Sequence, residues 1–265
     1  MRDTAAHPAA REMPTASGAR ALPEEVAVAL TYQGSTQAVM MASPSDLEDF
    51  ALGFSLSEGL IDSAREIESL EILPHPQGFE ARLWLAAPRA EAMAARRRRS
   101  LGPVGCGLCG IDSLDAALRP LPDRSHVALR LSQSALIAAA DAMRAQQPLQ
   151  DATRAAHAAA FVAPQGDILC LREDVGRHNA LDKLIGALAC SGIDPAMGAV
   201  LMTSRLSVDM VQKTAIAGAP VLCAVSAPTV LAVRQAEAAG LTLACLPRAD
   251  RGQLDIFTRP DRITT

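Results

Sequence analysis

Two cysteines, Cys106 and Cys109, carry the clearest chemical signal in the sequence. They lie in the stretch Gly102-Pro103-Val104-Gly105-Cys106-Gly107-Leu108-Cys109-Gly110. Glycines on both sides of the pair let the backbone approach another molecule closely. A cationic cluster or a helix start near a thiol favours the thiolate, which is the nucleophilic form. The run Arg96-Arg97-Arg98-Arg99 supplies such a cluster.

Three interpretations of this cysteine pair compete. A zinc site needs two further ligands, and the sequence has no second Cys-x-x-Cys and no His-x-x-x-His. A thioredoxin-like dithiol belongs at a helix start after a strand, without a glycine-rich lead. We therefore favour a nucleophilic cysteine that accepts and donates an atom, namely sulfur. The arginine run either contacts an anion or forms a solvated helix end.

Basic residues at two other places could hold an anionic ligand. Arg177 and His178 open an expected helix, with Asp174 as its N-cap, and helix N-termini bind anions. The alternative is that Asp174, His178 and Asp182, spaced four apart, pair along the helix. Arg205 follows an expected strand at the edge where open α/β sheets bind ligands, and the alternative is an ordinary surface arginine.

His157 and the remaining cysteines favour structural roles. His157 lies between alanines and is more often a core histidine than a catalyst. Cys170, Cys190, Cys223 and Cys245 lie in apolar stretches and are expected to act as small core residues.

The sequence predicts an N-terminal arm followed by two domains that position these residues. Residues 1–22 mix Ala, Pro, Arg and Ser without periodicity and are predicted to be a disordered arm. Residues 23–122 predict a small N-terminal α+β domain with a hairpin, a helix capped by the box Ser45-Asp46-Leu47-Glu48, two strands, and a helix running into the arginines. Residues 123–265 alternate strands and helices, which predicts a three-layer α/β domain. The expected elements there are strands 127–131, 158–162, 168–171, 199–202, 221–225 and 241–246, and helices 132–146, 176–190, 207–217 and 228–239.

Composition limits the function classes. The chain has 265 residues, 49% of them apolar, and a formal net charge of −4. One Trp, one Tyr and five Phe are too few for a base-stacking platform, so nucleic acid is not an expected partner. The longest charge-free run, between Lys213 and Arg234, is broken by Gly218, Pro220 and Pro228 and is expected to be a buried segment. No secretory leader is readable, so we expect a cytoplasmic protein without a membrane segment.

Several long motifs together resemble those of the formate dehydrogenase accessory sulfurtransferase family, the FdhD/NarQ family. The likeness covers roughly residues 23 to 260. Its motifs are Asp46-Leu47-Glu48-Asp49-Phe50-Ala51-Leu52-Gly53-Phe54, Gly105 to Gly110, Glu173-Asp174-Val175-Gly176-Arg177-His178-Asn179-Ala180-Leu181-Asp182-Lys183, Ser204-Arg205-Leu206-Ser207-Val208-Asp209-Met210-Val211-Gln212-Lys213 and Ala224 to Thr229.

The resemblance implies a specific activity. Members take sulfur from a cysteine desulfurase and pass it to the molybdenum cofactor, in its bis-molybdopterin guanine dinucleotide form, before that cofactor enters formate dehydrogenase. Cys106 corresponds to the persulfide carrier and Cys109 to the second cysteine. The resemblance also implies a C-terminal domain similar in fold to cytidine deaminases, a homodimer and no permanent metal. The cofactor-binding stretch maps to Leu246-Pro247-Arg248-Ala249-Asp250-Arg251.

Two rival functions remain to be weighed. A zinc deaminase needs His-x-Glu followed by Pro-Cys-x-x-Cys, and neither His157-Ala158-Ala159 nor the cysteine loop fits that pattern. A non-catalytic chaperone that binds the cofactor or the apo-enzyme is the alternative to the sulfur carrier. The sequence leaves open the role of Cys109, the desulfurase and molybdoenzyme involved, the dimer geometry and the path of the sulfur.

Overall fold

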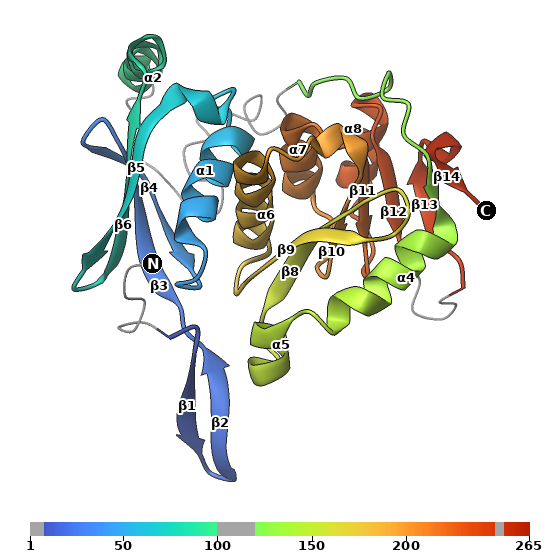
Figure 1. Ribbon diagram of the computed structural model, residues 1–265, viewed down its shortest axis with the longest axis horizontal. Coiled ribbons are helices and arrows are strands. Elements are labelled where there is room, and N and C mark those ends of the chain that lie inside the picture. Colours follow the sequence, from blue (N-terminus) through green and yellow to red (C-terminus); the bar gives the residue numbers. More distant parts are fainter. Residues whose placement is uncertain (1–7, 100–119, 247–251) are drawn as a thin grey trace.

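The computed structural model describes residues 8–99, 120–246 and 252–265. It is a mixed α/β protein with a four-stranded sheet at one end and a six-stranded sheet at the other (Figure 1). The α/β class predicted from the sequence is confirmed. The predicted domain boundary at residues 122 and 123 stays a prediction, because residues 100–119 lie outside the described ranges.

The four-stranded sheet has the order β4-β3-β6-β5. Its elements are β3 (Val26–Tyr32), β4 (Ser35–Ala42), α1 (Leu47–Ser57), β5 (Ile67–His75), β6 (Gly78–Leu85) and α2 (Ala87–Arg99). The hairpin and both strands expected here are confirmed, and alternate residues of the strands pack under α1 in one apolar core. The expected capping box is wrong: α1 begins at Leu47 after Asp46, which has a left-handed backbone and makes no side-chain cap.

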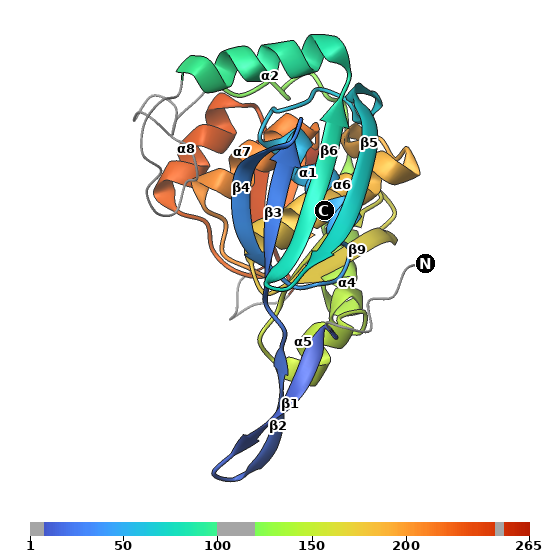
Figure 2. The ribbon, with the colours of Figure 1, turned by 90° about the vertical axis from the view of Figure 1, so that its left-hand side faces the viewer.

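Residues 10–23 form a hairpin, so the prediction that residues 1–22 are a disordered arm is wrong for this part. Strands β1 (Ala10–Thr15) and β2 (Gly18–Pro23) pair antiparallel and project from the body (Figure 2). All their side chains are exposed or half-buried. The hairpin is therefore defined by its backbone ladder and not by a buried face, which is why a hydrophobicity pattern cannot reveal it.

The six-stranded sheet has the order β13-β12-β11-β10-β8-β9, with β10, β11 and β12 parallel. Its elements and their connections are α4 (Gln133–Arg144), α5 (Pro148–Thr153), β8 (His157–Val162), β9 (Ile168–Asp174), α6 (Arg177–Ser191), β10 (Ala199–Met202), α7 (Val208–Ala217), β11 (Val221–Ala224), α8 (Val230–Ala238), β12 (Thr242–Cys245) and β13 (Asp255–Thr258). Helices α6, α7 and α8 cover one face and α4 the other (Figure 1), each over its own apolar core. The three layers predicted from the alternation are confirmed.

One expected strand is much shorter than predicted. Of residues 127–131, only Leu131 enters a strand, β7 (Leu131–Ser132), which pairs with β14 (Ile263–Thr264). The segment before it is held instead by the buried Arg262, which donates to the carbonyls of Val127 and Arg124. A side chain far along the chain thus replaces the strand ladder.

Helices α1 and α6 join the two halves of the molecule. A Cβ at Gly53 would lie 1.7 Å from the Asp182 carbonyl oxygen, and one at Gly186 would lie 1.9 Å from the Asp49 carbonyl oxygen. Only glycine permits this backbone contact, so these two residues fix how closely the halves approach. Within the described ranges, no helix is long and apolar enough to cross a membrane.

Candidate functional site

Part of the predicted site lies outside the described residues. This applies to Cys106, Cys109 and the stretch Pro247, Arg248, Ala249, Asp250 and Arg251. The cysteine loop follows α2, which ends at Arg99 as the sequence predicted.

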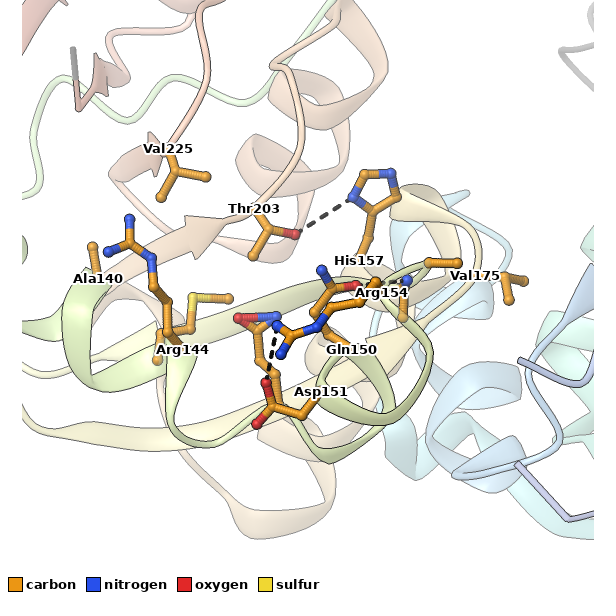
Figure 3. A pocket seen from close by; sticks show the side chains of 13 residues that line it. Ala140, Arg144, Gln150, Asp151, Arg154, His157, Val175, Thr203 and Val225 are labelled. Atoms are coloured by element: carbon orange, nitrogen blue, oxygen red, sulfur yellow. Dashed lines mark hydrogen bonds and ion pairs between the residues drawn. The ribbon is translucent and has the colours of Figure 1, made fainter. Parts of the chain in front are cut away.

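The carboxyl edge of the parallel strands forms a cavity. Strands β10 and β11 end there, and β8, which runs antiparallel to β10, begins there at His157. The cavity has a volume of about 540 Å³ and is shown in Figure 3. Its lining comprises Ala140, Met143, Arg144, Gln147, Gln150, Asp151, Arg154, Ala155, Ala156, His157, Val175, Thr203 and Val225. This is the edge at which open α/β sheets bind ligands.

The charged side chains that line this cavity are two arginines and one acid. Arg154 lies 3.5 Å from Asp151, and Arg144 pairs with Asp141, which is outside the lining, at 2.8 Å. Figure 3 shows Arg144 and His157 on opposite sides of the hollow. Such a lining suits an anionic ligand better than a cation.

His157 is half-buried at the carboxyl edge of the parallel strands. It is therefore not the core residue that its alanine neighbours led us to expect. Its Nδ1 lies 3.5 Å from Oγ1 of Thr203, which also accepts a hydrogen bond from the Ala158 amide. Burial lowers the pKa of His157 below its ordinary value, and the positive charge of Arg177 lowers it further. His157 therefore tends to be neutral and can accept a proton or a hydrogen bond.

Arg177 and His178 occupy the first turn of α6 as predicted, in different surroundings. Arg177 does not line the cavity; its Nε is buried and has no hydrogen-bond partner in the described part of the chain. A buried donor without a partner is costly, so a ligand that accepts from it would stabilise the site. His178 lies 3.5 Å from Asp209, and this contact lowers the pKa of the Asp209 carboxyl.

Two other predicted ligand residues take different positions. Arg205 follows β10 at the same edge and is exposed, but it does not line the cavity. The side chain of Leu246 is buried in the core beneath α4, and its amide donates to the Ala224 carbonyl over 2.8 Å.

Asp174 is not the N-cap of α6, because Gly176 holds that place. Its carboxylate is fully buried and accepts four bonds: from the Ser43 amide at 2.9 Å, Lys183 Nζ at 2.7 Å, the Gly176 amide at 2.8 Å and Asn179 Nδ2 at 3.0 Å. Lys183 also donates to the Ser43 carbonyl. The hydrogen bonds of Asp174 therefore connect the turn after β4, at Ser43, to the turn before α6, where Val175 lines the cavity.

Asp182 belongs to a second buried cluster. It lies 2.9 Å from Lys213 and accepts from Ser57 at 2.6 Å, while Lys213 also pairs with Glu58 at 2.7 Å. Burial raises the pKa of Asp182. Burial alone would lower the pKa of Lys213, but the carboxylates of Asp182 and Glu58 raise it above its ordinary value. Asp174, His178 and Asp182 therefore do not pair with one another, and much of the long motif joins the two halves of the molecule.

The four cysteines outside the loop differ in exposure. Cys223 and Cys245 are buried as expected, and burial raises the pKa of Cys223 to about 12. Cys170 is half-buried, and Cys190 is exposed, so its assignment to the core is wrong. Among the described residues, no group of three His, Cys, Asp or Glu side chains could hold a metal.

The sequence analysis missed Arg144, Gln150, Arg154 and Thr203. Thr203 directly follows the strand that ends at Met202, so the rule that selected Arg205 also identifies it. The helices that carry Arg144 and Gln150 reach the cavity only through tertiary packing, and no local pattern marks them.

Comparisons with known proteins agree with one another. The model of the FdhD/NarQ family matches residues 23–264. A sulfur carrier protein FdhD from Agrobacterium fabrum is 53% identical over 258 residues, which is 97% of this chain and 94% of that protein. A sulfur carrier protein FdhD from Cupriavidus necator is 50% identical over 91% of this chain and 82% of that protein.

A solved structure has the same fold. It is the crystal structure of a candidate formate dehydrogenase accessory protein from Desulfotalea psychrophila, with a TM-score of 0.71 and 25% identity. The match covers 96% of this chain and 97% of that one, so it includes both sheets.

Proposed function

The chain belongs to the FdhD/NarQ family, and we propose on this basis that it is a sulfur carrier required for formate dehydrogenase activity. The observation that carries the proposal is the identity of about half of all residues to proteins named sulfur carriers, over nearly the whole chain. Its substrates are a persulfide donor and an acceptor that takes sulfur.

We propose Cys106 as the sulfurtransferase nucleophile. Its thiolate attacks the terminal sulfur of the persulfide on a cysteine desulfurase. The donor's S–S bond breaks, the donor cysteine leaves as a thiolate, and a persulfide forms on Cys106. Cys109 follows Cys106 by three residues. Its thiolate either attacks the inner sulfur of the Cys106 persulfide, which forms a Cys106–Cys109 disulfide and expels sulfide, or it only supports the loop.

The acceptor that we propose is the molybdenum cofactor in its bis-molybdopterin guanine dinucleotide form, bound as a substrate before insertion. Arg144 and Arg154 in the cavity lining support an anionic ligand at the sheet edge, and so does the buried Nε of Arg177, which lies outside that lining and has no partner among the described residues. Arg177 and Arg205, with Arg248 and Arg251, are the proposed phosphate contacts. His178 is held by Asp209 and is a weaker candidate.

The family resemblance supports three further proposals about the working form. The protein acts in the cytoplasm, it is a homodimer, and it meets a cysteine desulfurase and formate dehydrogenase in turn. No permanent metal is required by this scheme.

The test replaces Cys106 by alanine. We expect Cys106→Ala to fold and to bind cofactor while formate dehydrogenase activity is lost, and Cys190→Ala, which removes an exposed thiol elsewhere, to keep that activity. Full activation by Cys106→Ala would reject the carrier and favour a chaperone that only binds and protects the cofactor.

A further inference from the structure

Strand β9 borders a second cavity, which the proposed sulfur transfer does not use. Within the described ranges β9 pairs with β8 only, so it is an edge of the six-stranded sheet. A groove of about 760 Å³ follows it from Ile168 to Glu173. Its walls include Pro148, Leu149 and Ala152 of α5 on one side, and Ser45 and Asp46 on another.

Helix α5 separates this groove from the cavity at the sheet edge. Pro148, Leu149 and Ala152 line the groove, whereas Gln150 and Asp151 line the other cavity. At 3.6 residues per turn these two sets lie on opposite faces of the helix. The groove is therefore a separate surface feature.

The backbone of β9 can accept another strand. The Leu171 carbonyl receives its bond from the Arg172 side chain, at 2.8 Å, and so points away from β8. Covering an edge carbonyl with a charged side chain is a common protection of sheet edges. A side chain can move aside for an incoming amide. Leu169, on the same strand, is 51% exposed and offers an apolar contact.

The walls of the groove carry an excess of negative charge. Arg172 is paired with Asp49 at 2.7 Å, whereas Asp46 lies 3.7 Å from Arg172 and is 40% exposed. Burial is the largest effect on Glu173 and raises the pKa of its carboxyl. The charges of Asp151 and Asp46 raise this pKa further, although the backbone amides of Gln150 and Leu149 lower it. A cation in the groove would therefore be favoured by complementarity.

We propose that this groove binds an extended segment of a partner protein, added to β9 as a further strand, with a lysine or arginine placed near Asp46. Main-chain hydrogen bonds to the edge supply affinity, and the Asp46 carboxylate supplies selection for a basic side chain. This surface does not depend on the sulfur chemistry, so its test separates it from the proposed function.

The experiment measures binding of a defined peptide to the full chain. The peptide has about nine residues, enough to span the seven of β9, and alternates threonine and valine around one central lysine. A second peptide has glutamate in place of the lysine. A third carries N-methyl groups on alternate amides, which remove its strand-forming donors.

We expect the lysine peptide to bind and to protect the amides between Leu169 and Glu173 from hydrogen exchange. Binding should weaken by about fivefold for the glutamate peptide and for Asp46→Asn, as loss of one partly exposed ion pair implies. Asparagine tolerates the left-handed backbone of residue 46, so this variant should fold. The control Asp141→Asn, on the exposed face of α4, should bind as the parent does.

Three results would overturn the proposal. The first is equal binding of the N-methylated peptide, and the second is binding without protection of the β9 amides. The third is protection of those amides in the free chain that grows with protein concentration, which would identify a second copy as the occupant.

Discussion

Replacing Asp174 by asparagine should strongly destabilise the protein. The substitution keeps the shape of the side chain but removes the only anion among the described residues within salt-bridge distance of Lys183. Both side chains are 0% exposed, so the Lys183 ammonium would remain buried beside the Ser43 carbonyl without a countercharge. Breaking a buried pair in this way costs about 3–5 kcal/mol. Asparagine also cannot accept at both former oxygen positions, so the Ser43 or the Gly176 amide loses a bond.

Urea unfolding followed by circular dichroism measures this loss. Asp141→Asn, which removes an exposed partner of Arg144, is the matched control and should change the free energy of unfolding by about 0.5 kcal/mol or less. The double variant Asp174→Asn with Lys183→Met should recover part of the loss, because no buried charge is left alone. A loss for Asp174→Asn no larger than that of the control would refute the idea that this carboxylate joins the two halves.

Three further predictions concern the sites. Burial and the charge of Arg177 hold the pKa of His157 below its ordinary value of about 6.5. Protonation of His157 therefore favours the unfolded chain. The free energy of unfolding should fall as the pH drops from about 6.5 through the lowered pKa. His157→Gln should remove that part of the pH dependence, and an unchanged pH profile in this variant would contradict the reasoning. In the folded protein iodoacetamide should modify Cys190 but leave the buried Cys223 intact, and mass spectrometry that found equal labelling would count against the packing described. Arg177→Met should weaken binding of guanosine diphosphate about tenfold, because one charge-assisted hydrogen bond is lost. The control Arg234→Met, at an exposed position, should bind as the parent chain does. If calorimetry gives the same affinity for Arg177→Met as for the parent chain, Arg177 is not part of the binding site.

The sequence was most informative where burial repeats with a regular period. Strand 199–202 and helix 207–217 were placed within a residue, because apolar periodicity and the breaker Gly218 define them locally. The hairpin at residues 10–23 was missed because it buries no face. The strand expected at 127–131 was lost because Arg262, from a distant position, donates to the backbone carbonyl of Val127 at its start.

The candidate site was only partly predictable for the same reason. Arg177 was found because helix starts attract anions, and its buried Nε fits that role. Asp174 and Asp182 lie in the same motif, yet their charges are used to hold α6 against the N-terminal half. A sequence shows that a carboxylate is present, but the partner that it meets across a fold is set by tertiary packing.

The central claim is that Cys106 carries sulfur. Its most direct test is mass spectrometry of the full chain after incubation with a cysteine desulfurase and cysteine, with the peptides carrying Cys106 and Cys190 measured separately. The account predicts an adduct of about 32 Da, one sulfur atom, on the peptide with Cys106 and Cys109, which is lost in Cys106→Ala. An adduct that persists on that peptide in Cys106→Ala, or the absence of any adduct on the parent chain, would contradict it.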